Sequence, residues 1–123
     1  MKVRKKEVSE NYRSDDLAVD VIKYLLDQTP EIDPKLVDDV IGVDANPEGE
    51  QGLQIGRQIS KRALGKEVPG MTVNRYCCSG LETISIAVAK IKAGMGQIFL
   101  RLSGAESIYD TYDRIQIGSP VIK

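Results

Sequence analysis

The sequence predicts an α/β fold in which helices pack on a mostly parallel sheet. Helix-like and strand-like segments alternate along the chain in the order α-β-α-β-α-β, which is typical of parallel strands joined by crossover helices. One strand-like segment ends at Cys77, and a long helical pattern begins directly after it. With 123 residues, of which 41% are hydrophobic, the chain has the size and composition of one globular domain.

The first helix and the first strand are predicted before residue 44. Ser14 is the expected N-cap of the helix, and apolar residues then recur at helical spacing until Thr29-Pro30 stops the run. A turn-rich segment follows, and the apolar residues 36–37 and 40–43 indicate a short strand.

The middle of the chain is predicted to form a loop, a helix and a strand. Residues 46–52 have the composition of a loop. A second helix, with its apolar stripe at Ile55, Ile59 and Ala63, is expected to close near Gly65 and to lead into a strand at residues 71–76.

The third helix is predicted to run from Cys78 or Ser79 to Ala93 and to be buried. Apolar residues occupy nearly all of its sides, as is usual for a helix packed on every side. They are Leu81, Ile84, Ile86, Ala87, Val88, Ala89 and Ile91. Glycines 94 and 96 end this helix, and residues 97–102 indicate the last strand.

Composition and charge argue against several classes of function. The 17 basic and 18 acidic residues give a net charge of −1, so nothing favours nucleic acid as a partner. No apolar run is long enough to span a membrane, and no targeting signal is recognisable. The basic N-terminal segment, residues 1–11, is expected to be a solvated terminus. The two cysteines are adjacent, which disfavours a disulfide and favours free thiols in the cytoplasm.

The candidate site lies at the carboxyl edge of the predicted sheet, where open α/β sheets bind their ligands. Cys77 stands at the end of one strand, Glu106 lies just beyond another, and the loop 46–52 follows a third. Free N–H groups and the positive end of the helix dipole favour a thiolate at such a strand-to-helix turn. No metal site is predicted.

Three segments resemble the thiolase family in order and spacing. Residues 68–82, VPGMTVNRYCCSGLE, resemble its active-site cysteine region; residues 46–57 resemble the loop and helix start of its acetyl-CoA C-acyltransferase branch; and residues 104–107 resemble its Gly-Gly-x-Glu-Ser segment. The resemblance implies the N-terminal half of a layered α/β/α thiolase fold over residues 12–107, followed by a divergent tail at 108–123.

The resemblance also implies a chemistry. Cys77 would be the acyl-accepting nucleophile of a thiolase-type acyltransferase, forming an acyl thioester during fatty-acid or ketoacyl-CoA metabolism. Coenzyme A thioesters would be substrates, and no cofactor would be needed. The partners implied are an acyl-CoA and either further copies of the chain or a thiolase partner subunit.

The departures from the family pattern predict that the chain alone is inactive. It contains no histidine, and the family's Gly-His-Pro histidine, Asn-Glu-x-Phe motif and second catalytic cysteine are missing. The family's first strand, central in its sheet, is also missing, which predicts a gap or an unpaired edge. Arg101 in a buried strand would require a partner.

Three alternatives to an enzyme therefore remain open. The chain could be a non-catalytic truncated subunit or assembly module that pairs with a full-length thiolase, a redox-reactive dithiol protein using Cys77 and Cys78, or a partial gene product. Cys78 is interpreted as a small residue in a crowded turn and is rejected as a second base.

Other polar residues near these motifs are given structural roles. Gly80 allows close backbone approach, Glu106 is expected to bind backbone N–H groups, and the roles of Asn74 and Arg75 are left undecided. Three cations at the end of the second helix could touch a CoA phosphate but are interpreted as a solvated helix end: Lys61, Arg62 and Lys66.

Overall fold

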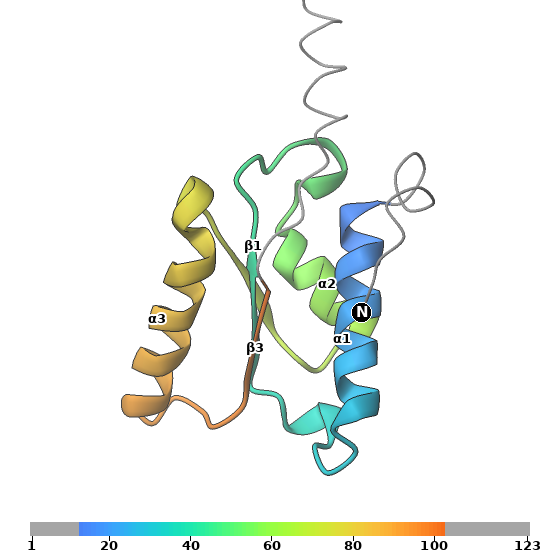
Figure 1. The fold of residues 1–123 in the computed structure, drawn as a ribbon, viewed down its shortest axis with the longest axis vertical. Helices are drawn as coiled ribbons and strands as arrows, with labels where there is room; N and C mark the ends of the chain where they lie inside the picture. Colours follow the sequence, from blue (N-terminus) through green and yellow to red (C-terminus); the bar gives the residue numbers. More distant parts are fainter. Residues whose placement is uncertain (1–12, 103–123) are drawn as a thin grey trace, which may run out of the picture.

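A computed structural model describes residues 13–102 of the chain, and the predicted alternation of helices and strands is present (Figure 1). The helices are α1 (Ser14–Gln28), α2 (Ile55–Ala63) and α3 (Ser79–Lys92), and the strands are β1 (Asp39–Val43), β2 (Gly70–Val73) and β3 (Phe99–Arg101). Short 3-10 turns connect them: η1 (Pro34–Leu36), η2 (Gly49–Gln51) and η3 (Tyr76–Cys78). The domain bounds at residues 11, 107 and 108 lie outside the described residues.

The three strands form one parallel sheet in the order β2-β1-β3. Val40 lies opposite Gly70 on one side, and Asp39 lies opposite Phe99 on the other. α1 and α2 cover one face of the sheet and α3 covers the opposite face, as Figure 1 shows. The layered α/β/α arrangement predicted from the sequence is therefore confirmed for this part of the chain.

Of the expected gap or unpaired edge, the gap is absent among the described strands, and β2 and β3 are the outer strands of their sheet. β1 is hydrogen-bonded to β2 on one side and to β3 on the other, so the three strands form one continuous sheet. The expectation about Arg101 also changes, because this residue ends a three-residue strand and its side chain is exposed. It therefore carries no burial penalty that a partner would have to offset.

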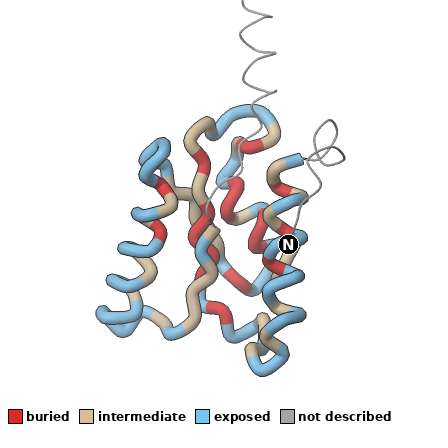
Figure 2. The backbone as a smooth tube through the Cα atoms, viewed as in Figure 1, coloured by how far each residue is buried: buried red, intermediate tan, exposed pale blue. Residues whose placement is uncertain are grey.

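The main apolar core lies between α1, α2 and the sheet. Val19 and Ile22 of α1 pack with Ile55 and Ile59 of α2, and Leu100 of β3 packs against this cluster. A second cluster surrounds Val37, Val40 and Val68 and shares Leu100. In Figure 2 the buried residues follow the sheet and the inner sides of these two helices.

Glycines allow α2 to lie unusually close to the strands. A Cβ added at Gly56 would lie 2.0 Å from the carbonyl oxygen of Met71, and one added at Gly42 would lie 2.9 Å from the Cα of Gly56. The Gly56 amide also donates to the Thr72 hydroxyl, at 2.9 Å. This backbone contact fixes α2 against β1 and β2.

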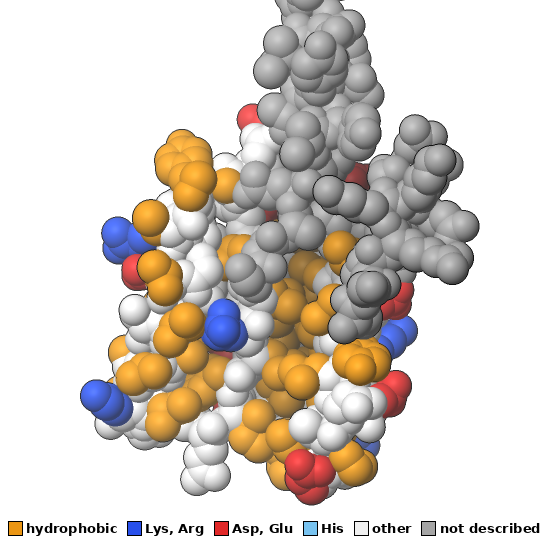
Figure 3. Space-filling model, viewed as in Figure 1, with side chains coloured by type: hydrophobic (Ala, Val, Ile, Leu, Met, Phe, Trp, Pro, Cys, Tyr) orange, Lys and Arg blue, Asp and Glu red, His pale blue; other side chains and the backbone are white. Residues whose placement is uncertain are grey.

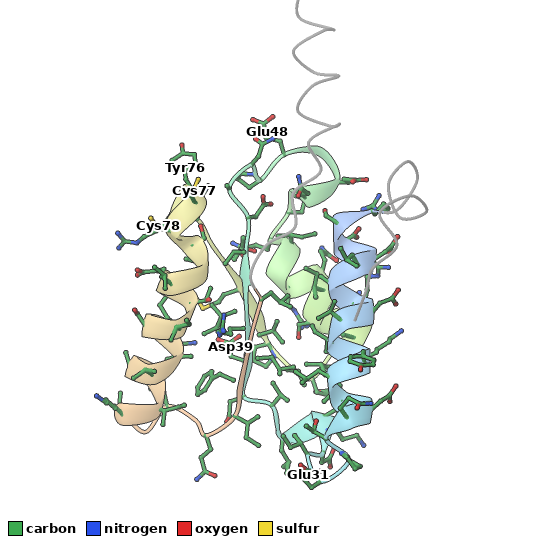
Figure 4. The ribbon with its side chains drawn as sticks, viewed as in Figure 1. Glu31, Asp39, Glu48, Tyr76, Cys77 and Cys78 are labelled. Atoms are coloured by element: carbon green, nitrogen blue, oxygen red, sulfur yellow. The ribbon has the colours of Figure 1, made fainter. Side chains whose placement is uncertain are left out.

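The prediction that the helix after Cys77 is buried is wrong for the described residues. Only Ser79 and Thr83 of α3 are buried. Its apolar residues form an outward stripe, also visible along α3 in Figure 3: Leu81, Ile84, Val88 and Ile91. α3 meets the sheet instead through small side chains and through an ion pair of 2.5 Å between Lys90 and Asp39 of β1. Asp39 is labelled in Figure 4.

Candidate active site

Cys77 lies in the turn that joins β2 to α3, at the carboxyl edge of the sheet. β2 ends at Val73, the 3-10 turn η3 contains Tyr76, Cys77 and Cys78, and α3 begins at Ser79. The Cys77 thiol is free and exposed. The structure thus places the predicted nucleophile at the predicted strand-to-helix turn and leaves it open to solvent.

Tyr76 bends the backbone directly before this cysteine. Its φ angle is +50°, a left-handed conformation that costs a residue with a side chain about 1–2 kcal/mol. The Tyr76 amide donates to the Asn74 side-chain oxygen, at 3.0 Å. The Tyr76 side chain is 73% exposed, so packing does little to offset the cost. Local hydrogen bonds must therefore hold the turn.

Ser79 supplies two of these hydrogen bonds from a buried position. Its side-chain oxygen accepts from the Arg75 amide at 2.8 Å, and its hydroxyl donates to the Tyr76 carbonyl at 2.7 Å. Ser79 was not singled out from the sequence. The signal was Ser79-x-x-Glu82, the pattern of a capping box, but the structural N-cap is Cys78, and the Ser79 hydroxyl bonds backward into the turn.

The loop after β1 lies next to the Cys77 turn. The Asp44 amide donates to the Val73 carbonyl at 3.2 Å, and the Asn74 side-chain amide donates to the Ala45 carbonyl at 3.3 Å. Two of the three loops expected at this edge therefore meet, which gives Asn74 a linking role. Glu106, from the third loop, lies outside the described residues.

Cys78 is also free and exposed, but it lies differently from Cys77. Figure 4 shows Cys77 at the tip of α3 beside Tyr76, while Cys78 lies on the outer side of the helix start. The two side chains do not face a common space. This arrangement agrees with the rejection of Cys78 as a second base for a substrate held at Cys77.

The charges around the turn are largely matched. The Arg75 guanidinium lies 3.3 Å from the Glu82 carboxylate, so neither charge is isolated beside the thiol. Of the three cations considered for phosphate binding, Lys66 lies 3.8 Å from Glu67 at an exposed site and Arg62 pairs with Asp15 and Asp16 of α1.

Asp15 is the centre of an ion-pair network that joins α1 to α2. It is 6% exposed and binds Arg13 at 2.9 Å and Arg62 at 2.7 Å. Burial alone would raise the pKa of this carboxyl, but the hydrogen bond and charge of Arg13 and the charge of Arg62 outweigh it and lower the pKa. Hydrogen bonding to Asp16 raises the pKa of Arg62. Arg62 thus serves the helix pair.

Two further findings concern the described residues. An apolar cavity of about 110 Å³ lies between α1, α2 and the end of β1, and Cys77 is not among its lining residues. No helix within residues 13–102 has the length and hydrophobicity needed to cross a bilayer. The chemistry available at the site is that of an accessible thiol at a helix N-terminus.

Known proteins share this sequence pattern. The family described as "Thiolase, N-terminal domain" matches residues 2–118. The chain is 42% identical over 91 residues to a 3-ketoacyl-CoA thiolase of Saccharophagus degradans. The aligned residues make up 73% of this chain and 23% of that protein. It is 40% identical over 97 residues to a β-ketoadipyl-CoA thiolase of Acinetobacter baylyi. These residues make up 78% of this chain and 24% of that protein.

A third relative has the same coverage. The 3-oxoadipyl-CoA/3-oxo-5,6-dehydrosuberyl-CoA thiolase of Escherichia coli is 39% identical over 97 residues, which cover 78% of this chain and 24% of that protein. The chain therefore spans about a quarter of the length of these relatives. Because the family match includes nearly the whole sequence, the chain belongs to the thiolase family, whose N-terminal domain it matches.

Proposed function

We propose that this chain provides the acyl-accepting cysteine of a thiolase-type acyltransferase. The Cys77 thiolate attacks the carbonyl carbon of an acyl-CoA thioester, the bond from that carbon to the CoA sulfur breaks, and CoA leaves as a thiolate that takes up a proton. A second substrate then collects the acyl group. The observation that supports this most directly is the exposed Cys77 at the turn before α3, inside the segment that matches the family.

The proposed substrates are coenzyme A thioesters of the 3-ketoacyl class. The relatives carry the names 3-ketoacyl-CoA thiolase and β-ketoadipyl-CoA thiolase. CoA and its thioesters enter as substrates, so the acyl transfer calls for no cofactor. The proposed setting is cytoplasmic fatty-acid or ketoacyl-CoA metabolism.

We propose further that the chain alone has little or no turnover. Condensation needs a base that removes a proton next to a carbonyl, and histidine, the standard activator of a cysteine nucleophile, is absent from these 123 residues. A helix N-terminus stabilises a thiolate by only about 0.3–1 kcal/mol. A thiolase partner subunit would supply the missing groups, because further copies of this chain lack histidine as well.

Labelling with acyl-CoA tests the role of Cys77 without requiring turnover. Purified protein is incubated with acetyl-CoA and acetoacetyl-CoA, digested, and analysed by mass spectrometry for an acyl group on the peptide that contains both cysteines. Wild type and Cys78→Ser are expected to gain one acyl group, whereas Cys77→Ser is expected to gain none. Equal labelling of Cys77→Ser and Cys78→Ser would show ordinary thiol acylation and contradict the proposal.

The second candidate is a non-catalytic subunit that pairs with a full-length thiolase. The outward apolar stripe of α3 favours it, since Leu81 is 71% exposed and Ile91 is 48% exposed. Co-elution with a full-length thiolase, together with an unlabelled Cys77, would support this candidate over the first. A thiolysis assay on the chain alone that gave rates typical of the family would contradict both the expected lack of turnover and this second candidate.

A further inference from the structure

One buried hydroxyl, that of Ser79, makes two of the hydrogen bonds in the turn that presents Cys77. Ser79 is 3% exposed, and its side chain reaches the chain at two points that precede the cysteine. It accepts the Arg75 amide at 2.8 Å and donates to the Tyr76 carbonyl at 2.7 Å. The Ser79 side chain therefore bonds to the amide of the residue before the left-handed Tyr76 and to the carbonyl of Tyr76 itself.

Two backbone hydrogen bonds also close this turn, from the Cys78 amide to the Arg75 carbonyl at 3.1 Å and from the Ser79 amide to the Tyr76 carbonyl. The other side-chain contacts are less able to hold it. The Asn74 side chain accepts the Tyr76 amide at 3.0 Å, but Asn74 is exposed, and water competes for the same groups. The ion pair of Arg75 with Glu82 joins an Arg75 side chain that is 65% exposed. Exposed pairs of this kind contribute little to stability. Among these side-chain contacts, the Ser79 hydroxyl is the buried one.

We propose that Ser79 is a positioning residue for Cys77, fixing the left-handed turn at Tyr76 so that the thiol stays at the N-terminus of α3. The inference rests on the proposed function, because it concerns how the acyl-accepting sulfur is presented. Ser79 itself contacts neither substrate nor the reacting atoms in this role. It acts through the backbone of Arg75 and Tyr76.

Removal of the hydroxyl has a consequence specific to the thiol. Without it, the Arg75 amide loses its acceptor, the Tyr76 carbonyl loses one donor, and the turn around the left-handed Tyr76 loses two of its hydrogen bonds. The chain then relaxes toward an ordinary φ angle, and the sulfur leaves the field of the helix N-terminus. A helix N-terminus stabilises a nearby anion, and the thiolate is the form that reacts with an alkylating agent. Loss of this stabilisation corresponds to alkylation about two- to fivefold slower at neutral pH.

The test measures alkylation of Cys77 by iodoacetamide as a function of pH. All variants carry Cys78→Ser, so that Cys77 is the one thiol of the chain. In this background, Ser79→Ala is expected to slow alkylation at neutral pH about two- to fivefold, because the sulfur is no longer held at the start of α3. Ser79→Thr, which keeps the hydroxyl, is expected to restore the original profile.

Thr83→Val is the matched structural control. Thr83 is fully buried one turn further along α3, and its hydroxyl donates to the Gly80 carbonyl at 2.9 Å. Its loss removes a buried hydroxyl bond of the same helix without touching the turn. Thr83→Val is expected to lower the melting temperature yet leave the pH profile of Cys77 unchanged. A profile unaltered by Ser79→Ala, or altered equally by Thr83→Val, would overturn the inference.

Two further measurements keep the inference separate from folding and from the proposed function. If Ser79→Ala does not fold, hydrogen exchange of the Arg75 amide in the wild-type chain replaces it: slow exchange supports the bond to Ser79, and exchange at the rate of an open loop overturns it. Acyl-CoA labelling is run on the same samples. If Cys77 gains no acyl group but its alkylation profile still changes in Ser79→Ala, the proposed function is contradicted and the inference about Ser79 is supported.

Discussion

Tyr76 adopts a backbone conformation that glycine accepts more readily than any residue with a Cβ. Because its side chain is largely exposed, truncation removes little packing. The energy of the left-handed backbone conformation therefore decides which variant is more stable. We predict that Tyr76→Gly is more stable than Tyr76→Ala by about 1 kcal/mol. Urea denaturation of the two variants measures this difference. At a position with negative φ the order would reverse, because alanine is then the more stabilising of the two.

Asp15 predicts how acid affects the pairing of α1 with α2. The pKa of Asp15 is lowered in the folded state, so the stability it contributes is fully present above its ordinary value of 3.8 and is lost as pH falls through the folded value. We expect Asp15→Asn to destabilise the chain by about 1–2 kcal/mol at neutral pH. Denaturant titrations should show this difference narrowing below pH 3.8.

Asp27→Asn provides the control on the same helix. Asp27 is exposed near the end of α1, and its replacement should change the unfolding free energy by no more than about 0.5 kcal/mol. The free energy of unfolding of Asp15→Asn could instead differ from that of wild type by a constant amount down to the lowest pH. That result would show that the Asp15 charge is not the source of the effect.

At the residue scale, the sequence located the thiol but not the groups that hold it. Cys77 could be placed because an apolar strand pattern ends where a helical pattern begins. The left-handed angle of Tyr76 could not be anticipated, since tyrosine carries no preference for that conformation. The role of Ser79 depends on that angle, because only then do the Arg75 amide and the Tyr76 carbonyl come within reach of one hydroxyl.

At the scale of elements, α2 depends on a glycine contact that no local pattern reveals. A Cβ at Gly56 would lie 2.0 Å from the Met71 oxygen and 2.7 Å from the Met71 carbonyl carbon, and neither backbone atom can move without moving β2. We predict that Gly56→Ala costs at least about 3 kcal/mol or prevents folding. Urea denaturation and the yield of folded protein measure the effect.

Gly65→Ala separates steric conflict from backbone strain. Gly65 has a φ angle of +99°, but no heavy atom lies within 4 Å of the point that a Cβ would occupy, so alanine there meets strain alone. Its expected cost is about 1–2 kcal/mol. If Gly56→Ala and Gly65→Ala lowered the free energy of unfolding by the same amount, α2 would be able to move away from the sheet at little cost.

α3 shows where periodicity misleads. Its sequence is apolar on several sides, which favours burial, but helices on one face of a three-stranded sheet can bury only one side. The buried side carries Ser79 and Thr83, and the stripe of larger residues from Leu81 to Ile91 faces outward. Which side faces the strands is a tertiary property, and the apolar pattern alone did not decide it.

For the whole molecule, the alternation of elements and the parallel sheet followed from the sequence, whereas the strand order did not. The expectation was a gap or an unpaired edge, but β1 bonds directly to both β2 and β3, so the described strands contain no gap. Hydrogen bonding explains the difference, because a gap would leave backbone N–H and C=O groups of two strands unpaired inside the molecule. β1 is therefore the central strand, with Val40 and Ile41 fully buried.

This arrangement predicts an uneven distribution of local stability. β1 is hydrogen-bonded on both sides and lies beneath the core shared with α1 and α2, so its amides should exchange only through global unfolding. α3 has only two buried side chains, and its larger apolar residues face outward, so we expect it to detach while the rest stays folded. Native-state hydrogen exchange should show mid-helix α3 amides exchanging on the order of tenfold faster than those of Val40 and Ile41, a difference of about 1.4 kcal/mol in opening free energy. Equal protection of α3 and β1 would contradict this hierarchy, because it would mean that the helix behind Cys77 unfolds only together with the sheet.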